Sequence, residues 1–255
     1  MKRTIVIGPL IGVMLASLSG CDGIWTDGGQ AGNDAPAVSE SATPSPKPEL
    51  VLATAVIGLG KQNLKFTVDG GKGDVRSGSL DAASGAVKVT ADVGGSPTEL
   101  ITYRDDIYIG GLRGDGKWFH ARVPNFKDSA IPFLAMADPL FGASFLGSAS
   151  DVQQSQPNTL SGTADLTRVI ASGTTQLIAY AFGKAAGAEA TALPFTATVD
   201  DAGALSAVNM VFPKADRGKD LVYNLKITEV GGAVTITVPA EGDTVPAPAD
   251  FYTAP

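Results

Sequence analysis

The sequence contains one cysteine, one histidine and few charges among its 255 residues. A single cysteine excludes an internal disulfide framework, and one cysteine with one histidine leaves too few soft ligands for a typical zinc or copper site. Charged residues make up 18%, and 19 Lys and Arg against 26 Asp and Glu give a net charge of −7. Nucleic-acid binding needs a basic face to neutralise phosphates, so no nucleic-acid partner is expected.

What the sequence does have is apolar residues and turn formers. Hydrophobic residues make up 44%, and the chain has 31 Gly and 16 Pro. This composition is typical of a globular protein with many turns rather than of a disordered chain. The length allows one domain, or at most two, with a sizeable core.

The N-terminus has the pattern of a lipoprotein signal. A basic start, Met1 to Arg3, precedes an apolar, uncharged stretch over residues 5–18. This stretch is shorter than the ~20 residues of a membrane span and is typical of the hydrophobic region of a secretory signal. Small residues then precede Cys21, the only cysteine. We therefore predict a signal peptide over 1–20 and a bacterial lipobox, with a diacylglyceryl group on Cys21 that anchors the chain to the outer face of the cytoplasmic membrane.

Three segments of different composition follow the predicted signal peptide. Residues 21–48 are rich in Gly, Ser, Pro and Ala and predict a flexible tether. Residues 49–240 carry periodic patterns and predict the folded domain, and residues 241–255 predict an irregular tail. The domain begins with a predicted short helix that starts at Glu49, after Pro48, and ends near Gly58 or Gly60.

From Asn63 the hydrophobic period becomes two, which indicates strands. The predicted strands are 64–68, 73–81, 86–93, 99–103, 106–109, 117–123, 161–170, 194–200, 205–212, 221–229 and 234–238. Because most are joined by short Gly- and Asp-containing turns, neighbours are expected to be antiparallel. Residues 129–152 predict short helices, and residues 174–184 predict a longer one.

Two motifs close the domain, D-x-x-G-x-L at Asp200 to Leu205 and K-x-x-x-x-G-G-x-V at Lys226 to Val234. With the lipobox, the tether and the element order, they make residues 49–239 resemble the LppX/LprG lipoproteins of actinobacteria, within the LolA/LolB-like group. The resemblance implies an α+β fold, in which a curved antiparallel sheet forms a half-barrel and helices pack over its concave face. It also implies an apolar cavity that holds the acyl chains of a lipid or glycolipid, a role as a carrier within the cell envelope, and a membrane lipid exporter as a candidate partner.

The expected cavity lining combines two sets of apolar residues. Alternation along the strands places each group of strand residues on one face of the sheet. The middle segment supplies the second set. Its prolines and glycines prevent long helices, so we expect this segment to form the mouth of the cavity. The candidate ligand-binding residues are Leu64, Phe66, Val68, Val87, Val89, Ile107, Ile109 and Trp118 from strands, and Phe133, Leu134, Met136, Leu140, Phe141, Phe145 and Leu146 from the middle segment.

The sequence offers little support for catalysis. The only histidine, His120, lies in a predicted strand and is interpreted as a surface or rim residue; a hydrolase would need it beside a nucleophile. No nucleophile elbow of the G-x-S-x-G type is present. The paired acids at Asp105 and Asp200 lie at predicted turns, where Asp caps backbone amides. We therefore expect no catalytic residues, no metal and no cofactor. The alternative to a carrier is a sensor or interaction lipoprotein for envelope assembly, with a fully packed core.

Overall fold

The computed structural model of this chain describes residues 46–71, 74–93, 95–127, 131–170, 173–216 and 218–253. The predicted signal peptide, the predicted lipidation site Cys21 and most of the predicted tether lie outside the described residues. The described part lies in one compact unit, Pro44–Pro255. Within that part, none of the helices combines the length and the apolar character needed to cross a membrane.

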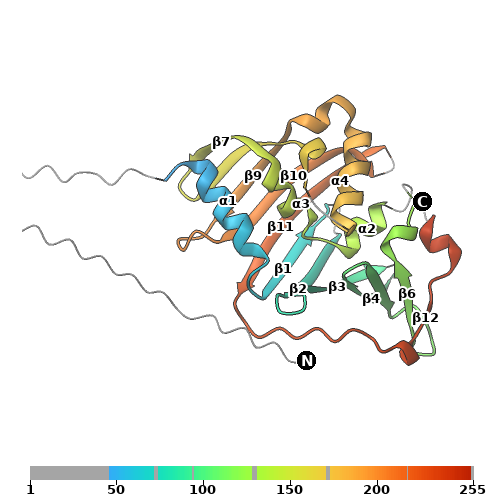
Figure 1. Cartoon of the computed structure of the whole chain (residues 1–255). Coiled ribbons are helices and arrows are strands. Elements are labelled where there is room, and N and C mark those ends of the chain that lie inside the picture. Colours follow the sequence, from blue (N-terminus) through green and yellow to red (C-terminus); the bar gives the residue numbers. More distant parts are fainter. Residues whose placement is uncertain are drawn as a thin grey trace, which may run out of the picture. The chain divides into compact units, whose positions relative to one another are not determined.

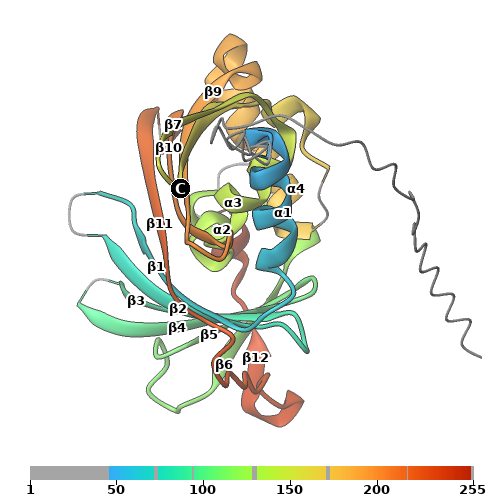
Figure 2. The same cartoon turned by 90° about the vertical axis from the view of Figure 1, so that its left-hand side faces the viewer.

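One twelve-stranded sheet dominates the described part of the chain (Figure 1). Its strand order is β12-β6-β5-β4-β3-β2-β1-β11-β10-β9-β8-β7, and every pair is antiparallel except β12 with β6. The strands are β1 (Leu64–Asp69), β2 (Val75–Asp81), β3 (Ala86–Val93), β4 (Ser96–Tyr103), β5 (Asp106–Gly110), β6 (Trp118–Arg122), β7 (Ala149–Gln156), β8 (Thr159–Ala164), β9 (Leu193–Val199), β10 (Leu205–Asp216), β11 (Lys219–Val230) and β12 (Thr244–Pro246). The sheet is open at β12 and β7, and its strands curve strongly (Figure 2), which is compatible with a half-barrel.

Alternating sequence explains why the strands bury one face. In β1, Leu64, Phe66 and Val68 are buried, whereas Lys65 points to solvent and forms an ion pair with Glu229 of β11 at 2.6 Å. The predicted hairpin at Asp200 forms as expected. Its carboxylate accepts hydrogen bonds from the amides of Ala202 and Ala204, at 2.9 and 2.8 Å, which fixes the turn between β9 and β10.

Four α-helices accompany the sheet in the described residues: α1 (Pro48–Leu59), α2 (Ile131–Ala137), α3 (Phe141–Phe145) and α4 (Gly173–Ala186). Proline in the first turn of α1 suits a helix start because that position lacks an intrahelical partner for its amide. Helix α1 contacts β7, β9 and β10, α2 contacts β4, α3 contacts β10 and β11, and α4 contacts β10. The fold is thus α+β, with a large, mostly antiparallel open sheet, as the sequence predicts.

The two faces of the sheet carry different clusters. The main core joins the helices to one face, and its largest fully buried side chains include Phe66, Phe182, Phe212 and Tyr223. A small second cluster contains Ala86, Ile101 and Ile236, with Tyr103, Tyr108, Trp118, Val234 and Val238 against it. The segment after β11 therefore covers part of the opposite face of the sheet.

Four predicted elements differ from the structure. The strand predicted over 161–170 ends at Ala164 in β8 (Thr159–Ala164), and a 3-10 helix follows at Leu166–Arg168. Residues 234–238 alternate between apolar and other residues but form no strand. They contribute Ile236 to the second cluster and pair with no neighbouring strand. Residues 149–152 were expected in the helical segment, but they form the first half of β7 (Ala149–Gln156), an edge strand whose polar sequence buries only Val152. Residues 241–255 were expected to be irregular, yet they include β12 and two short 3-10 helices, at Glu241–Asp243 and Ala249–Tyr252.

Candidate ligand-binding site

The main core brings together fourteen of the fifteen predicted cavity residues. Twelve of them are buried members of one cluster, and Phe133 and Met136 are partly buried against it. The twelve are Leu64, Phe66, Val68, Val87, Val89, Ile107, Ile109, Leu134, Leu140, Phe141, Phe145 and Leu146. The strand residues and the middle segment therefore meet, as the alternation predicts.

Trp118 is the exception, and its predicted position is wrong. It belongs to the second cluster, and its indole lies over Gly110, where an added Cβ would come within 2.9 Å of ring atoms. In β6 the neighbour Phe119 packs against the main core, and Ala121, two residues further on, is buried in it. A one-residue step along a strand moves a side chain to the opposite face, so Trp118 does not line the same space as Ile107 and Ile109.

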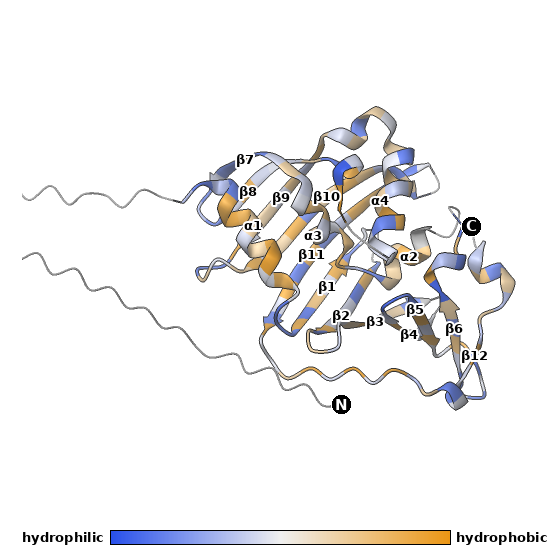
Figure 3. Cartoon of the chain, in the orientation of Figure 1, coloured by the Kyte–Doolittle hydropathy of each residue, from blue (hydrophilic) through white to orange (hydrophobic). Residues whose placement is uncertain are grey.

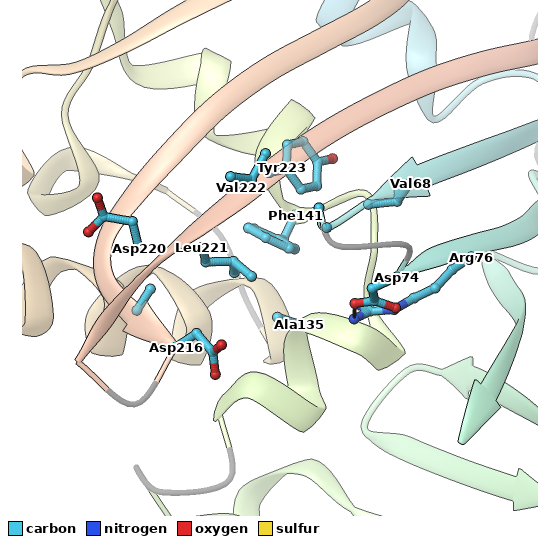
Figure 4. Close-up of a pocket in the computed structure, with 13 residues that line it drawn as sticks. Val68, Asp74, Arg76, Ala135, Phe141, Asp216, Asp220, Leu221, Val222 and Tyr223 are labelled. Atoms are coloured by element: carbon cyan, nitrogen blue, oxygen red, sulfur yellow. Dashed lines mark hydrogen bonds and ion pairs between the residues drawn. The ribbon is translucent and has the colours of Figure 1, made fainter. Parts of the chain in front are cut away.

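A pocket of about 330 Å³ opens at one end of the main core. Its apolar wall includes Val68, Phe141 and Leu221 (Figure 4). Charged residues lie on both sides of this wall: Asp74 and Arg76 of the β1–β2 region on one side, Asp216 and Asp220 of the β10–β11 hairpin on the other. The arrangement offers an apolar floor with a polar rim.

Phe141 joins this pocket to an aromatic cluster inside the core. Its ring centroid lies 4.8 Å from that of Tyr223, 5.4 Å from Phe145 and Phe212, and 5.6 Å from Phe182. Aromatic pairs at such separations are favourable beyond the area they bury. The protein's own rings therefore fill the interior next to the pocket, and the open volume stays at its mouth.

Helix α3 is held close to β11 by a glycine and a hydrogen bond. Gly142 faces Tyr223 so closely that an added Cβ would overlap the tyrosine ring. The Tyr223 hydroxyl donates to the carbonyl oxygen of Pro139 at 2.8 Å, and burial raises the pKa of Tyr223 well above its usual value. These contacts fix the position of Phe141 in the apolar wall of the pocket.

The rim of the pocket is largely paired. Arg76 forms an ion pair with Asp74, and the carboxylate of Asp220 accepts the backbone amide of Lys214 at 3.1 Å. The Arg76–Asp74 ion pair lies near the surface, with Asp74 exposed, so it contributes little to stability. Exposed charged groups of this kind can instead exchange partners with the head group of a bound molecule.

Asp138 is a polar residue that the sequence analysis did not single out. It follows α2 and accepts a hydrogen bond from the Thr175 hydroxyl of α4 at 2.7 Å. Burial of the carboxyl raises the pKa of Asp138 above its ordinary value, against the lowering effect of Thr175 and of the Leu140 amide. A second hollow of about 430 Å³ lies here, lined by Asp138 together with Thr102, Arg104 and Thr174 among others.

The sequence analysis also did not name Tyr223, which lines the pocket, or Phe212 and Phe182, which pack against Phe141. Phe212 and Tyr223 lie at inward positions of strands whose alternation was correctly predicted, so the same pattern could have identified them. Asp138 had no comparable signal, because its environment depends on how α2 and α4 meet.

His120 has a carboxylate neighbour in the structure. Its Nε2 lies 2.8 Å from Oδ1 of Asp106, and its ring stacks on Tyr108 at 4.9 Å. The side chain is about one third exposed, which agrees with a rim position. An acyl-transfer site would also require a serine or cysteine nucleophile in reach of the imidazole, and neither of these two partners supplies one. Among the described residues, no group of three or more His, Cys, Asp or Glu could hold a metal ion.

Comparison with known proteins adds no assignment. No protein-family model matches this chain, and none of the curated proteins matches it significantly. The resemblance to the LppX/LprG lipoproteins therefore stays a proposal. The functional argument rests on the sequence pattern and on the geometry of the pocket.

Proposed function

We propose that this chain is a non-catalytic, lipid-anchored carrier that binds the acyl chains of a lipid or glycolipid between its sheet and its helices. One observation carries the proposal: the 330 Å³ pocket opens directly onto Phe141, a buried member of the apolar core that helices and sheet share. In this proposal the helices cover the concave face of the half-barrel, as in the LppX/LprG family that the sequence resembles. The exposed pocket is where a chain enters.

Apolar burial would supply most of the affinity. The pocket volume is at the lower end of the ~300–1,000 Å³ of typical ligand pockets. A longer acyl chain therefore needs Phe141 and its neighbours to move. Helix α3 has only five residues and is followed at once by the 3-10 helix Leu146–Ser148. Such short elements have few internal hydrogen bonds, so displacing them costs less than displacing a long helix.

The rim would orient the head group. Asp74 and Arg76, with Asp216 and Asp220 opposite, place charges of both signs around the opening. A few polar groups at the edge of an apolar site typically set orientation rather than affinity. The tether predicted for residues 21–48 would raise the concentration of the domain at the membrane that supplies its lipid.

A second candidate, the sensor or interaction lipoprotein, is favoured by one observation. The rings of Phe141, Phe145, Phe182, Phe212 and Tyr223 fill the interior behind the pocket. A core of this kind can be complete without a ligand. The two candidates differ in whether hydrocarbon can displace these rings.

Titration with a fluorescent fatty acid separates the two candidates. In a chain that lacks the residues before Asp22, the carrier proposal predicts saturable uptake, abolished by Phe141→Arg because the charge occupies the apolar floor. Leu221→Asp, at the partly buried lip of the pocket, should weaken uptake at least about ten-fold, which corresponds to roughly 1.4 kcal/mol.

The matched control is Val211→Asp, which places the same charge at an exposed position of β10. It should bind as the unchanged chain does. Circular dichroism checks that each variant is folded. Uptake that is unchanged in folded Phe141→Arg and Leu221→Asp would contradict this binding site, and no uptake by the unchanged chain would favour the interaction module.

A further inference from the structure

Helix α1 is apolar on its outer face as well as on its inner one. Leu52 and Ala55 are buried against the core, whereas Leu50 and Ile57 are each 62% exposed. Leu50, Ala53, Thr54 and Ile57 follow the i, i+3, i+4, i+7 spacing and share one exposed side of the helix. A helix that packs on a core normally carries charges on its solvent side, but the only charged residue of α1 is Glu49 (Figure 3).

Lysines flank this apolar side at both ends. Lys47 is the N-cap residue of α1, Lys61 follows its last turn, and both residues are exposed. The protein as a whole has a net charge of −7, so residues 47–61, with two flanking lysines and one glutamate, differ in sign from the rest of the chain. Apolar side chains between lysines are typical of a helix that lies in the interface of an anionic membrane.

The position of α1 in the chain points to the same partner. It begins 27 residues after Cys21, since 48 − 21 = 27. A Gly- and Ser-rich chain of that length has a root-mean-square span of about 30 Å. If Cys21 is lipidated, α1 is the first described element above the bilayer and stays within reach of its surface.

We propose that the outer face of α1 docks onto the anionic bilayer that holds the lipid anchor. The inference rests on the lipid-anchoring part of the proposed function and not on acyl-chain uptake. A weak contact is enough, because the tether makes docking an intramolecular event with a high effective concentration. Docking would bring a hollow of about 200 Å³ between α1 and the sheet, lined by Leu59, Leu64 and Leu205 among others, next to the membrane.

Spin labelling of the full lipidated chain tests the inference. A thioether at Cys21, the only cysteine, leaves an introduced cysteine as the single free thiol. The label is attached at Ile57→Cys on α1 or, as the matched control, at Val211→Cys, an exposed valine of β10. The chain is reconstituted in vesicles of phosphatidylethanolamine and phosphatidylglycerol, and label collisions are measured with oxygen, which enters bilayers, and with a nickel complex, which stays in water.

The expected result is a several-fold higher ratio of oxygen to nickel collisions at position 57 than at position 211. The exposed substitution Leu50→Asp, or vesicles of phosphatidylcholine alone, should lower the ratio at position 57. Equal ratios at the two positions would overturn the inference. A label at 57 that both reagents fail to reach would also overturn it, because the face would then be covered by protein, such as a second copy of the chain. Chains that do not float with the vesicles would overturn the docking and the anchoring together, whereas fatty-acid uptake is judged separately.

Discussion

At the scale of single residues, Gly142 decides how closely α3 approaches the sheet. A side chain there would overlap the ring of Tyr223 on β11. We predict that Gly142→Ala destabilises the protein by about 1–3 kcal/mol, because an extra methyl group in a packed core forces its neighbours to shift. Urea unfolding measures the change. Gly147→Ala is the matched control, since an added Cβ at Gly147 meets no atom within 4 Å; equal losses in the two variants would contradict the account.

Asp138 gives a prediction about pH. Its raised pKa means that the folded chain holds this proton more tightly than the unfolded chain does. Stability from this group is therefore present at low pH and is lost as the pH rises above its ordinary value of 3.8. Asp138→Asn has no carboxyl to ionise and therefore does not lose this stability. We predict that the free energy of unfolding of the native chain, compared with that of the variant, falls as the pH rises from about 4 to 7. Urea unfolding at several pH values checks the slope, and a difference that rises with pH would refute the assignment.

The residue scale is also where sequence reasoning succeeds and fails most clearly. Alternation along β1, β3 and β5 placed Leu64, Val89 and Ile107 on the core side because a strand allows only two directions. The same reasoning misplaced Trp118, since both Trp118 and Phe119 are aromatic and the sequence does not say which of them turns inward. Asp138 is defined by its contact with Thr175, 37 residues away, and no local pattern carries that information.

At the scale of elements, the C-terminal residues complete one edge of the fold. Strand β12 pairs in parallel with β6, and the Lys127 amide donates to the Tyr252 carbonyl at 2.9 Å. The ring of Phe251 lies 5.4 Å from that of Phe119, and the ring of Tyr252 lies 5.0 Å from that of Phe126. This segment therefore shields apolar side chains beside the edge of the sheet.

Removing those two rings should weaken the fold without removing a strand. We predict that Phe251→Ala combined with Tyr252→Ala costs about 2–4 kcal/mol, less than two fully buried aromatic truncations because both residues are half-buried. Thermal unfolding should show a clearly lower midpoint. Leu112→Ala, at a partly exposed loop residue, should leave the midpoint nearly unchanged. A double variant as stable as this control would show that the C-terminal segment does not support the core.

Among elements, those with a strong local signal were predictable. Strand β3 (Ala86–Val93) has the predicted bounds, and α1 and α4 lie within one residue of their predicted starts and within two of their predicted ends. Strand β7 was not predictable, because its sequence is polar and its pairing depends on β8. Residues 234–238 alternate as a strand would, but they bury Ile236 in the second cluster, with Val234 and Val238 partly buried beside it, and have no partner strand.

At the scale of the whole molecule, the fold does not decide between the two candidate functions. An open, curved sheet with helices on it is compatible both with a carrier and with a packed interaction module. The difference depends on a few rings around Phe141 and on a pocket of about 330 Å³, and no sequence period encodes whether a core gives way to a ligand. The resemblance to LppX/LprG lipoproteins supports the carrier, but the interior itself has to be tested.

The most direct test is native mass spectrometry of the chain purified with its cellular lipids. Residues before Asp22 are omitted, so that any added mass comes from a non-covalent ligand and not from Cys21. The account predicts a bound species with the mass of an acylated lipid, released as an acyl-containing molecule on denaturation and absent in Phe141→Arg. A bare chain that also takes up no lipid when one is offered would contradict the carrier function.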